Sequence, residues 1–364
     1  MSKLRAGIIG ATGMVGQRFI TLLKDHPWFE IKVLAASSAS AGKPYSEAVA
    51  GRWAMSEPIP DSVSGMIVED ASNVQSIADR VDLVFCAVNM PKDLTRALEE
   101  AYAKAETPVI SNNSACRWVE DVPMLIPEIN AGHTALIEHQ RRRLGTKRGF
   151  IAVKPNCSIQ SYVPALTPLM EFGPEKVSVC TYQAISGAGK TFDRWPEILD
   201  NVIPFIGGEE EKSEKEPLRI WGQINADLGR IDIAARPVIS AQCLRVPVSD
   251  GHMAAVSVDF SHRPTREQIL EKWNNASFAC DEYDLPSAPR PFLRYFDEPD
   301  RPQTRLDRDY QKGMGVTIGR LREDSIFQYK FVCLSHNTLR GAAGGGVLSA
   351  ELLTAMGFIG PKER

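Results

Sequence analysis

The chain has 364 residues, of which 43% are hydrophobic and 24% charged, a composition typical of a globular protein of roughly two domains. Its net charge of −3 and isoelectric point near 6.1 exclude an overall basic field that would hold a nucleic acid or an acidic membrane. Its seven cysteines are scattered, odd in number and free of CxxC pairs, which predicts reduced thiols and argues against a disulfide framework or a metal site. Glycines interrupt the first apolar run, and no apolar stretch approaches the ~20 residues that span a bilayer, so we expect a cytoplasmic protein.

Strand-like apolar runs alternate with helical patterns through the first 150 residues. Strands are predicted over residues 4–9, 31–36 and 81–88, the last apolar nearly throughout, as expected of a strand covered on both faces. One helix follows the first strand. Another begins at Pro91 and is expected to turn four side chains inward: Leu94, Leu98, Ala101 and Tyr102. This alternation predicts right-handed βαβ units and a doubly wound Rossmann-type sheet.

A glycine-rich turn joins the first strand to its helix, with glycines at positions 7, 10, 13 and 16. Glycine lets the backbone approach a pyrophosphate closely, and the following helix N-terminus favours its negative charge. The spacing is G-x-x-G-x-x-G rather than the G-x-G-x-x-G of NAD enzymes, and a tight turn without a ligand is the alternative. Because a strand precedes the turn and a helix follows it, we predict a dinucleotide site here.

The residues after the second strand predict which dinucleotide is bound. An NAD enzyme places an acidic residue about 20 positions beyond the glycines, where it binds the ribose hydroxyls. Here the strand is followed by Ser37, Ser38 and Ser40, and the first carboxylate is Glu47. A carboxylate would repel a 2′-phosphate, whereas hydroxyls and the nearby Lys43 can accept one. The sequence therefore favours NADP over NAD.

The rest of the chain predicts a second domain of a different kind. Extended runs over residues 176–186 and 231–260 have little helix between them, which is typical of a mixed or antiparallel sheet. Further elements are expected as strands over 316–320 and 327–334, helices over 190–202 and 211–228, an irregular excursion over 285–303, and a final helix over 339–356. We expect that last helix to pack on the nucleotide domain. The predicted domains are then 1–153 completed by 336–364, and an α+β catalytic and dimerisation domain over 154–335.

Residues 186–191, Ser-Gly-Ala-Gly-Lys-Thr, end like the phosphate loop of an ATPase. That motif requires a glycine six positions before its lysine, and Ala184 stands there instead. We therefore predict no ATPase-type site. A glycine loop against the nicotinamide side of the first site fits these residues better.

The stretch Pro-Asn-Cys-Ser, residues 155–158, follows the strand-like run 150–153. A cysteine at a strand-to-helix junction has backbone N–H groups and a helix dipole beside its sulfur, and these favour the nucleophilic thiolate. The alternative is a buried cysteine that behaves as a small apolar residue. His252 lies beside Gly251 between two extended runs, and a histidine near Cys157 would activate the thiol and transfer protons. As a lone histidine it would more often be structural.

Two further segments offer charged groups. Residues 111–117, ending in Arg117, follow the carboxyl end of a strand, where open α/β sheets bind ligands. Residues 207–212, Gly-Gly-Glu-Glu-Glu-Lys, place carboxylates and a lysine on a loop entering a helix. Alone, such a run is usually a solvated helix start.

Taken together, these motifs closely resemble aspartate-β-semialdehyde dehydrogenase over nearly the whole chain. The matching stretches are residues 10–16, 111–114, 155–158, 207–212 and 245–252. The strongest part is Pro-Asn-Cys-Ser combined with Arg245 seven residues before His252. The variant is similar to the archaeal and fungal branch, and Gly-Lys-Thr-Phe at 189–192 favours the fungal members.

The resemblance implies that β-aspartyl phosphate and NADPH give aspartate semialdehyde, NADP and phosphate, on the route to threonine, methionine and lysine. It implies that Cys157 forms a thioester, that His252 is the acid/base group, and that Gln183 orients the substrate; an exposed glutamine is the alternative for Gln183. Arg245 would bind the α-carboxylate through a two-point hydrogen bond.

Glu209 would meet the α-amino group, and it is preferred to Glu210 and Glu211 because its spacing of three to Lys212 fits the family. Arg117, Lys212 and Asn156 would hold the phosphoryl group, whose charge needs fixed positive partners. The resemblance also implies a homodimer or homotetramer formed through the sheet of the second domain. The predicted cofactor-binding residues are Gly10, Thr12, Gly13, Met14, Val15, Ser37, Ser38, Ser40, Cys86, Ser186, Gly187, Gly189 and Asn337.

Two alternative functions fit part of these motifs. N-acetyl-γ-glutamyl-phosphate reductase shares the fold and chemistry but usually carries Gly-Cys-Tyr-Pro around its cysteine, unlike residues 155–158 here. A catalytically silent NADP-binding sensor would be expected to lack Cys157, Arg245 or His252, and all three are present.

Overall fold

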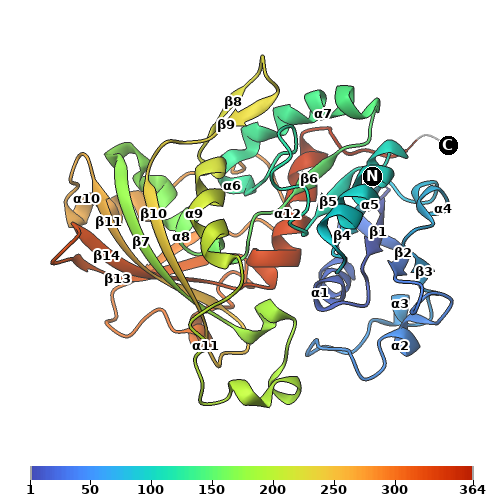
Figure 1. Ribbon diagram of the computed structural model, residues 1–364, viewed down its shortest axis with the longest axis horizontal. Helices are drawn as coiled ribbons and strands as arrows, with labels where there is room; N and C mark the ends of the chain where they lie inside the picture. Colours follow the sequence, from blue (N-terminus) through green and yellow to red (C-terminus); the bar gives the residue numbers. More distant parts are fainter. Residues whose placement is uncertain (1, 363–364) are drawn as a thin grey trace.

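The computed structural model describes residues 2–362, which build two six-stranded sheets (Figure 1). The first sheet is parallel throughout, in the order β3-β2-β1-β4-β5-β6. Its strands are β1 (Leu4–Ile9), β2 (Phe29–Ala36), β3 (Glu69–Asp70), β4 (Leu83–Cys86), β5 (Val109–Ser111) and β6 (Ile151–Val153). The doubly wound Rossmann-type sheet predicted from the sequence is confirmed.

Helices cover both faces of this sheet. They are α1 (Met14–Leu23), α2 (Tyr45–Ala48), α3 (Asp61–Ser64), α4 (Val74–Ala78), α5 (Lys92–Lys104), α6 (Pro127–Asn130) and α7 (Leu136–Leu144). Phe19 of α1 packs with Ile8 and Ile110 on one face, and Tyr102 of α5 packs with Val84 on the other. No helix among the described residues combines the length and apolar character needed to cross a membrane.

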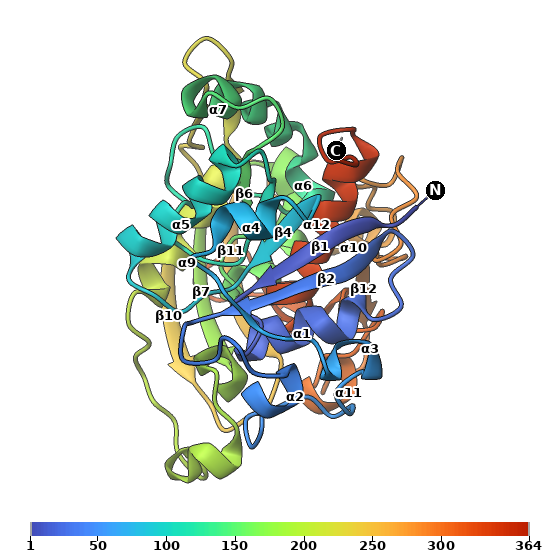
Figure 2. The same ribbon diagram turned by 90° about the vertical axis from the view of Figure 1, so that its right-hand side faces the viewer.

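The last helix, α12 (Gly344–Ala355), returns to this first sheet after a π-helical turn over Leu339–Ala343. Its Val347, Ala350 and Leu353 belong to the same apolar cluster as Ile8 and Phe19. Both ribbon views show α12, in red, beside the parallel strands (Figure 2). The predicted docking of the final helix on the nucleotide-binding unit therefore agrees with these contacts.

The second sheet is mixed, in the order β10-β7-β11-β14-β13-β12, as expected. Its strands are β7 (Pro174–Gln183), β10 (Val238–Arg245), β11 (His252–Phe260), β12 (Leu293–Phe296), β13 (Val316–Glu323) and β14 (Tyr329–Ser335). The remaining elements are α8 (Tyr162–Leu166), α9 (Glu209–Ile220), α10 (Arg266–Asn274), α11 (Thr304–Asp307) and the hairpin β8 (Gln223–Asn225) with β9 (Arg230–Asp232). Every second residue of β11 is buried, because one face of the sheet packs on α8 and α10 while the other carries exposed side chains such as Tyr182.

Several predicted elements differ from the structure. The helix predicted over 190–202 is wrong: the segment holds two three-residue 3-10 turns, and Trp195 between them is not helical, because the proline that follows it disfavours helical backbone. The helix predicted over 211–228 ends at Ile220, because Gly222 leads into the β8–β9 hairpin. The excursion over 285–303 contains the short strand β12. Leu94 was expected to face inward on α5 but is 51% exposed, since the buried face of that helix is formed by Thr95, Glu99 and Tyr102.

Candidate active site

Cys157 and His252 meet between the two sheets. Cys157 directly follows the loop after β6, and His252 is the first residue of β11. The Cys157 Sγ lies 3.5 Å from His252 Nε2. The backbone N–H of Ala184 donates to His252 Nδ1 at 3.1 Å, which leaves the proton of the neutral ring on Nε2, facing the sulfur.

The resting pair is uncharged. Burial, reinforced by the Glu209 carboxylate, raises the pKa of Cys157 to about 11, although Lys154, Arg117 and Arg245 oppose the shift. Burial and the Arg245 guanidinium lower the pKa of His252 to about 3. The helix dipole expected to favour the thiolate is small here, because Cys157 caps a 3-10 turn of only three residues (Ser158–Gln160).

Arg245 and Gln183 are brought beside this pair by parallel strand pairing. They are register partners at the carboxyl ends of β10 and β7, which therefore lie at the same edge of the sheet. Arg245 Nη1 donates to the carbonyl of Ala184 at 2.6 Å. A Cβ on Gly187 would lie 2.9 Å from Arg245 Nη1 and 3.1 Å from His252 Nε2. Glycine at 187 is therefore what allows the guanidinium and the imidazole to share one site.

A carboxylate at the start of α9 is the centre of a hydrogen-bond network. Glu209 accepts from Asn156 Nδ2 at 3.0 Å, from Lys212 Nζ at 2.7 Å and from Gln183 Nε2 at 3.2 Å. Burial acts to raise the pKa of Glu209, but Lys212 and these hydrogen bonds outweigh it, so the pKa is lowered overall and the group is an anion. Its neighbours point elsewhere: Glu210 accepts from the Cys243 backbone, and Glu211 pairs with Lys215 at the surface. Of the three carboxylates, Glu209 faces the site.

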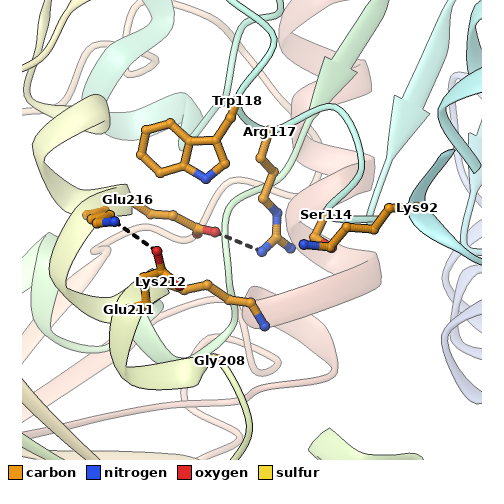
Figure 3. Close-up of a pocket in the computed structure, with 9 residues that line it drawn as sticks. Lys92, Ser114, Arg117, Trp118, Gly208, Glu211, Lys212 and Glu216 are labelled. Carbon is orange, nitrogen blue, oxygen red and sulfur yellow. Dashed lines mark hydrogen bonds and ion pairs between the residues drawn. The ribbon is translucent and has the colours of Figure 1, made fainter.

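Arg117 lines a cationic cavity of about 490 Å³ between α5, the loop after β5 and α9 (Figure 3). The arginine is buried and bonds Glu216 Oε1 through Nη1 at 2.9 Å, while Glu216 Oε2 accepts the Asn156 backbone N–H at 2.6 Å. Figure 3 shows the guanidinium of Arg117 reaching toward Glu216, with Lys92 and Lys212 pointing into the same space. The lining residues are Lys92, Ser114, Arg117, Trp118, Gly208, Glu211, Lys212, Lys215 and Glu216.

A second cavity, of about 480 Å³, lies at the carboxyl ends of β1, β2 and β4. Of the residues predicted to bind the cofactor, it is lined by Gly10, Thr12, Gly13, Ser37 and Ser38. Met14, Val15, Ser40 and Cys86 do not line it, and Ser40 and Cys86 are buried. The others, Ser186, Gly187, Gly189 and Asn337, lie in or beside the loop next to His252, where Asn337 Nδ2 donates to Ser186 Oγ at 2.8 Å.

The sequence matches two family descriptions, the semialdehyde dehydrogenase NAD binding domain over residues 5–137 and the semialdehyde dehydrogenase dimerisation domain over residues 166–340. Aspartate-semialdehyde dehydrogenase of Aspergillus fumigatus is 43% identical over 364 residues, covering 98% of this chain and 99% of that protein. The relative of the same name from Archaeoglobus fulgidus is 45% identical over 353 residues, covering 96% and 98%. The chain belongs to the aspartate-semialdehyde dehydrogenase family.

Solved structures of this family have the same fold. Aspartate semialdehyde dehydrogenase with NADP from Candida albicans superposes with a TM-score of 0.87 at 39% identity, covering 98% of this chain and 100% of that one. The family resemblance noted from the motifs is thus confirmed. The preference for the fungal branch stays a prediction, because the fungal and archaeal relatives have nearly equal identities.

The residues of this family member fit a dinucleotide. Gly10 has φ +92°, and a Cβ there would lie 2.4 Å from the Ala87 carbonyl oxygen, so only glycine lets this turn pack against the end of β4 and border the second cavity. By contrast, residues 2–362 bring no three His, Cys, Asp or Glu side chains together as metal ligands.

Sequence reasoning missed several lining residues. Lys215 and Glu216 had a usable signal, since they follow Lys212 by three and four positions and so share its face of α9. Lys92 carried no such signal in the sequence, because only the fold brings α5 opposite α9. Asp70 and Ser72 of the second cavity follow a two-residue strand that is too short to show periodicity.

Proposed function

We propose that this chain is an NADP-dependent aspartate-semialdehyde dehydrogenase that reduces β-aspartyl phosphate to aspartate semialdehyde and releases phosphate. The observation that carries the proposal is the 3.5 Å contact between Cys157 Sγ and His252 Nε2. A nucleophile beside a hydrogen-bond donor, flanked by one guanidinium and one carboxylate, matches the two charges of an amino-acid substrate. The names of the relatives support the same reaction.

The covalent chemistry belongs to Cys157. Its sulfur attacks the acyl carbon, the carbon–oxygen bond to the phosphoryl group breaks, and phosphate leaves to give a thioester. Bound NADPH supplies the hydride that reduces this thioester. The resulting hemithioacetal collapses to the aldehyde, and the sulfur departs as thiolate.

His252 is proposed as the acid/base group. In the described conformation its Nε2–H can donate to the developing thiolate or to the hemithioacetal oxygen without a net proton transfer. Accepting a proton at Nε2 would first require the ring to give up the N–H bond from Ala184. The neutral donor role is therefore the one the resting geometry supports.

The substrate contacts follow from charge. Arg245 would bind the α-carboxylate with the N–H groups not engaged by the Ala184 carbonyl, and Glu209 would accept the α-ammonium group. Arg117, Lys212 and Asn156 would hold the phosphoryl group at the cationic cavity. Gln183, fixed to Glu209 at 3.2 Å, would orient the substrate.

The proposal includes the cofactor and the assembly. One end of NADP would be held by the glycine turn together with Ser37 and Ser38. The other end would be held by the Ser186–Gly189 loop together with Asn337. The proposed domains are residues 1–153 with 336–364, and 154–335. A homodimer or homotetramer would pair the face of the mixed sheet that exposes Tyr182, in a reducing, cytoplasmic compartment consistent with seven free cysteines.

The test is reduction of NADP by the purified protein in the presence of aspartate semialdehyde and phosphate. We expect NADPH absorbance to rise only with all three present, and much faster than with NAD or with N-acetyl-glutamate semialdehyde. Cys157→Ser should fold and bind NADP, yet lose essentially all activity. A Cys157→Ser enzyme that kept a tenth of the rate would overturn the nucleophile assignment.

A further inference from the structure

Glu99 is a buried glutamate on α5 that takes no part in the chemistry described above. Its side chain is 0% exposed, although a glutamate is almost never fully buried unless its carboxyl group is paired. Its partners both lie in the loop after β5. Ser111 Oγ donates to Glu99 Oε1, and Asn113 Nδ2 donates to the same oxygen at 2.9 Å. The cost of enclosing this carboxyl group is therefore offset by hydrogen bonds to one loop.

The same contacts fix how the loop leaves the sheet. The backbone N–H of Asn113 donates to Ser111 Oγ at 3.0 Å, so one hydroxyl group joins the Glu99 carboxyl to the backbone two residues further on. Asn113 Nδ2 also donates to Cys86 Sγ at 3.4 Å, at the end of β4. An amide group has two N–H donors, and both are used here. The Asn113 side chain is thus held in one orientation.

A few residues further on, the loop reaches the cationic cavity. Ser114 and Arg117 both line that cavity, and the Arg117 backbone N–H donates to the Ser114 carbonyl at 3.4 Å. Glu216 of α9 binds Arg117 Nη1, as described above, whereas Nη2 donates to the Asn112 carbonyl of the loop at 3.5 Å. The backbone that begins at Ser111 therefore helps to set where the guanidinium group lies.

We propose that Glu99 is a positioning residue for the phosphoryl group, and that it acts through the loop 111–117 by holding Ser114 and Arg117 at the cavity wall. The inference rests on the proposed function and deepens it. Glu99 itself does not line the cavity. A buried hydrogen-bond network rigidifies the segment that carries it, and an anion is bound more tightly when its binding groups are already in place.

The position of Glu99 on α5 separates this role from a general loss of structure. Leu98, the preceding residue, lines the second cavity, where NADP is proposed to bind. A change at Glu99 that displaced the whole helix would therefore weaken NADP binding as well as phosphate binding. A change that released only the loop would weaken phosphate binding and leave NADP and the semialdehyde nearly unaffected.

The experiment measures binding of inorganic phosphate to the full-length protein by isothermal titration calorimetry, together with KM for phosphate, semialdehyde and NADP. Glu99→Met removes the acceptor at a similar volume. Glu99→Gln keeps one oxygen, which is all that the loop uses. Glu100→Gln is the matched control, because this neighbouring glutamate is partly exposed and pairs with Arg96 at 3.1 Å. Circular dichroism establishes that each variant is folded.

Glu99→Met should raise the dissociation constant and KM of phosphate about tenfold, because a displaced binding group loses its contacts. KM for NADP and for the semialdehyde should change less than about twofold. Glu99→Gln should keep nearly the wild-type phosphate affinity, and Glu100→Gln should match the wild type. If Glu99→Met does not fold, Ser111→Ala, which removes the hydroxyl link but keeps the carboxyl group, should show the same selective loss.

A folded Glu99→Met protein with wild-type phosphate affinity would overturn the inference. Equal weakening of phosphate and NADP would also overturn it, since that result indicates a displaced helix rather than a released loop. The proposed function fails on a different result, namely a wild-type protein that binds phosphate but does not reduce NADP in the presence of the semialdehyde.

Discussion

Glu209 and Gln183 are joined by a 3.2 Å hydrogen bond, although one begins a helix and the other ends a strand of the mixed sheet. The contact matters because Gln183 is also the register partner of Arg245. A carboxylate and a guanidinium are thereby both held beside Gln183, at the edge of the mixed sheet where β11 begins with His252. The predictions that follow test this arrangement.

Arg245→Lys should weaken use of the semialdehyde while leaving NADP affinity unchanged. Lysine keeps the charge but cannot form two parallel bonds to a carboxylate, a loss of about 1.5–3 kcal/mol for a hydrogen bond to a charged group. We expect KM for the semialdehyde to rise about tenfold or more at that cost. Steady-state kinetics and a fluorescence titration of NADP would measure the two effects, and equal damage to both would move Arg245 out of the substrate site.

Gly187→Ala should lower kcat without unfolding the protein. The added methyl group would meet Arg245 Nη1 at 2.9 Å and His252 Nε2 at 3.1 Å, so one of these groups must shift. Overpacking of this kind costs about 1–3 kcal/mol. Gly207→Ala is the matched control, because a Cβ there meets nothing within 4 Å. Similar kcat values for the two variants, measured at saturating substrate, would contradict the proposed crowding.

Glu216→Gln should destabilise the protein strongly. Glu216 holds Arg117 at 2.9 Å and the Asn156 backbone at 2.6 Å, and all three residues are buried. Removing one partner of a buried ion pair costs about 3–5 kcal/mol, because the other charge is left without compensation. Glu211→Gln, which breaks the exposed pair with Lys215, should leave stability almost unchanged, because solvent screens that pair. Urea unfolding of both variants tests the contrast, and equal losses would show that Glu216 is not the anchor of Arg117.

Lys154 should make stability rise with pH above neutrality. Its pKa is lowered from 10.5 to about 7, so between these values the unfolded chain binds more protons than the native protein. The burial penalty is full below about pH 7 and shrinks as pH rises, with a slope of at most about 1.4 kcal/mol per pH unit. Cys157 acts in the opposite direction, but only above its ordinary value of 9.0.

The check is urea unfolding of wild type and Lys154→Met between about pH 7 and about pH 9, the window in which Lys154 titrates without Cys157. Lys154→Met should be the more stable protein near neutrality, and its advantage should shrink toward the alkaline end. A stability difference independent of pH would mean that Lys154 is charged in the native state throughout.

The sequence by itself determined the features that depend on neighbours along the chain. Apolar periodicity located β1, β2 and β4, since a buried strand must be apolar whatever lies beside it. The glycine spacing located the dinucleotide turn, because only glycine tolerates the approach seen at Gly10. The motif around Cys157 predicted a nucleophile at that position.

Tertiary structure decided what depends on partners distant in sequence. It selected Glu209 from three adjacent carboxylates, since helix α9 turns only that one toward Asn156. It brought Lys92 across from α9, and it buried Lys154, which lowers the pKa of that lysine. Side-chain placement and pKa depend on burial and on charges from distant segments, and neither can be read from the local sequence.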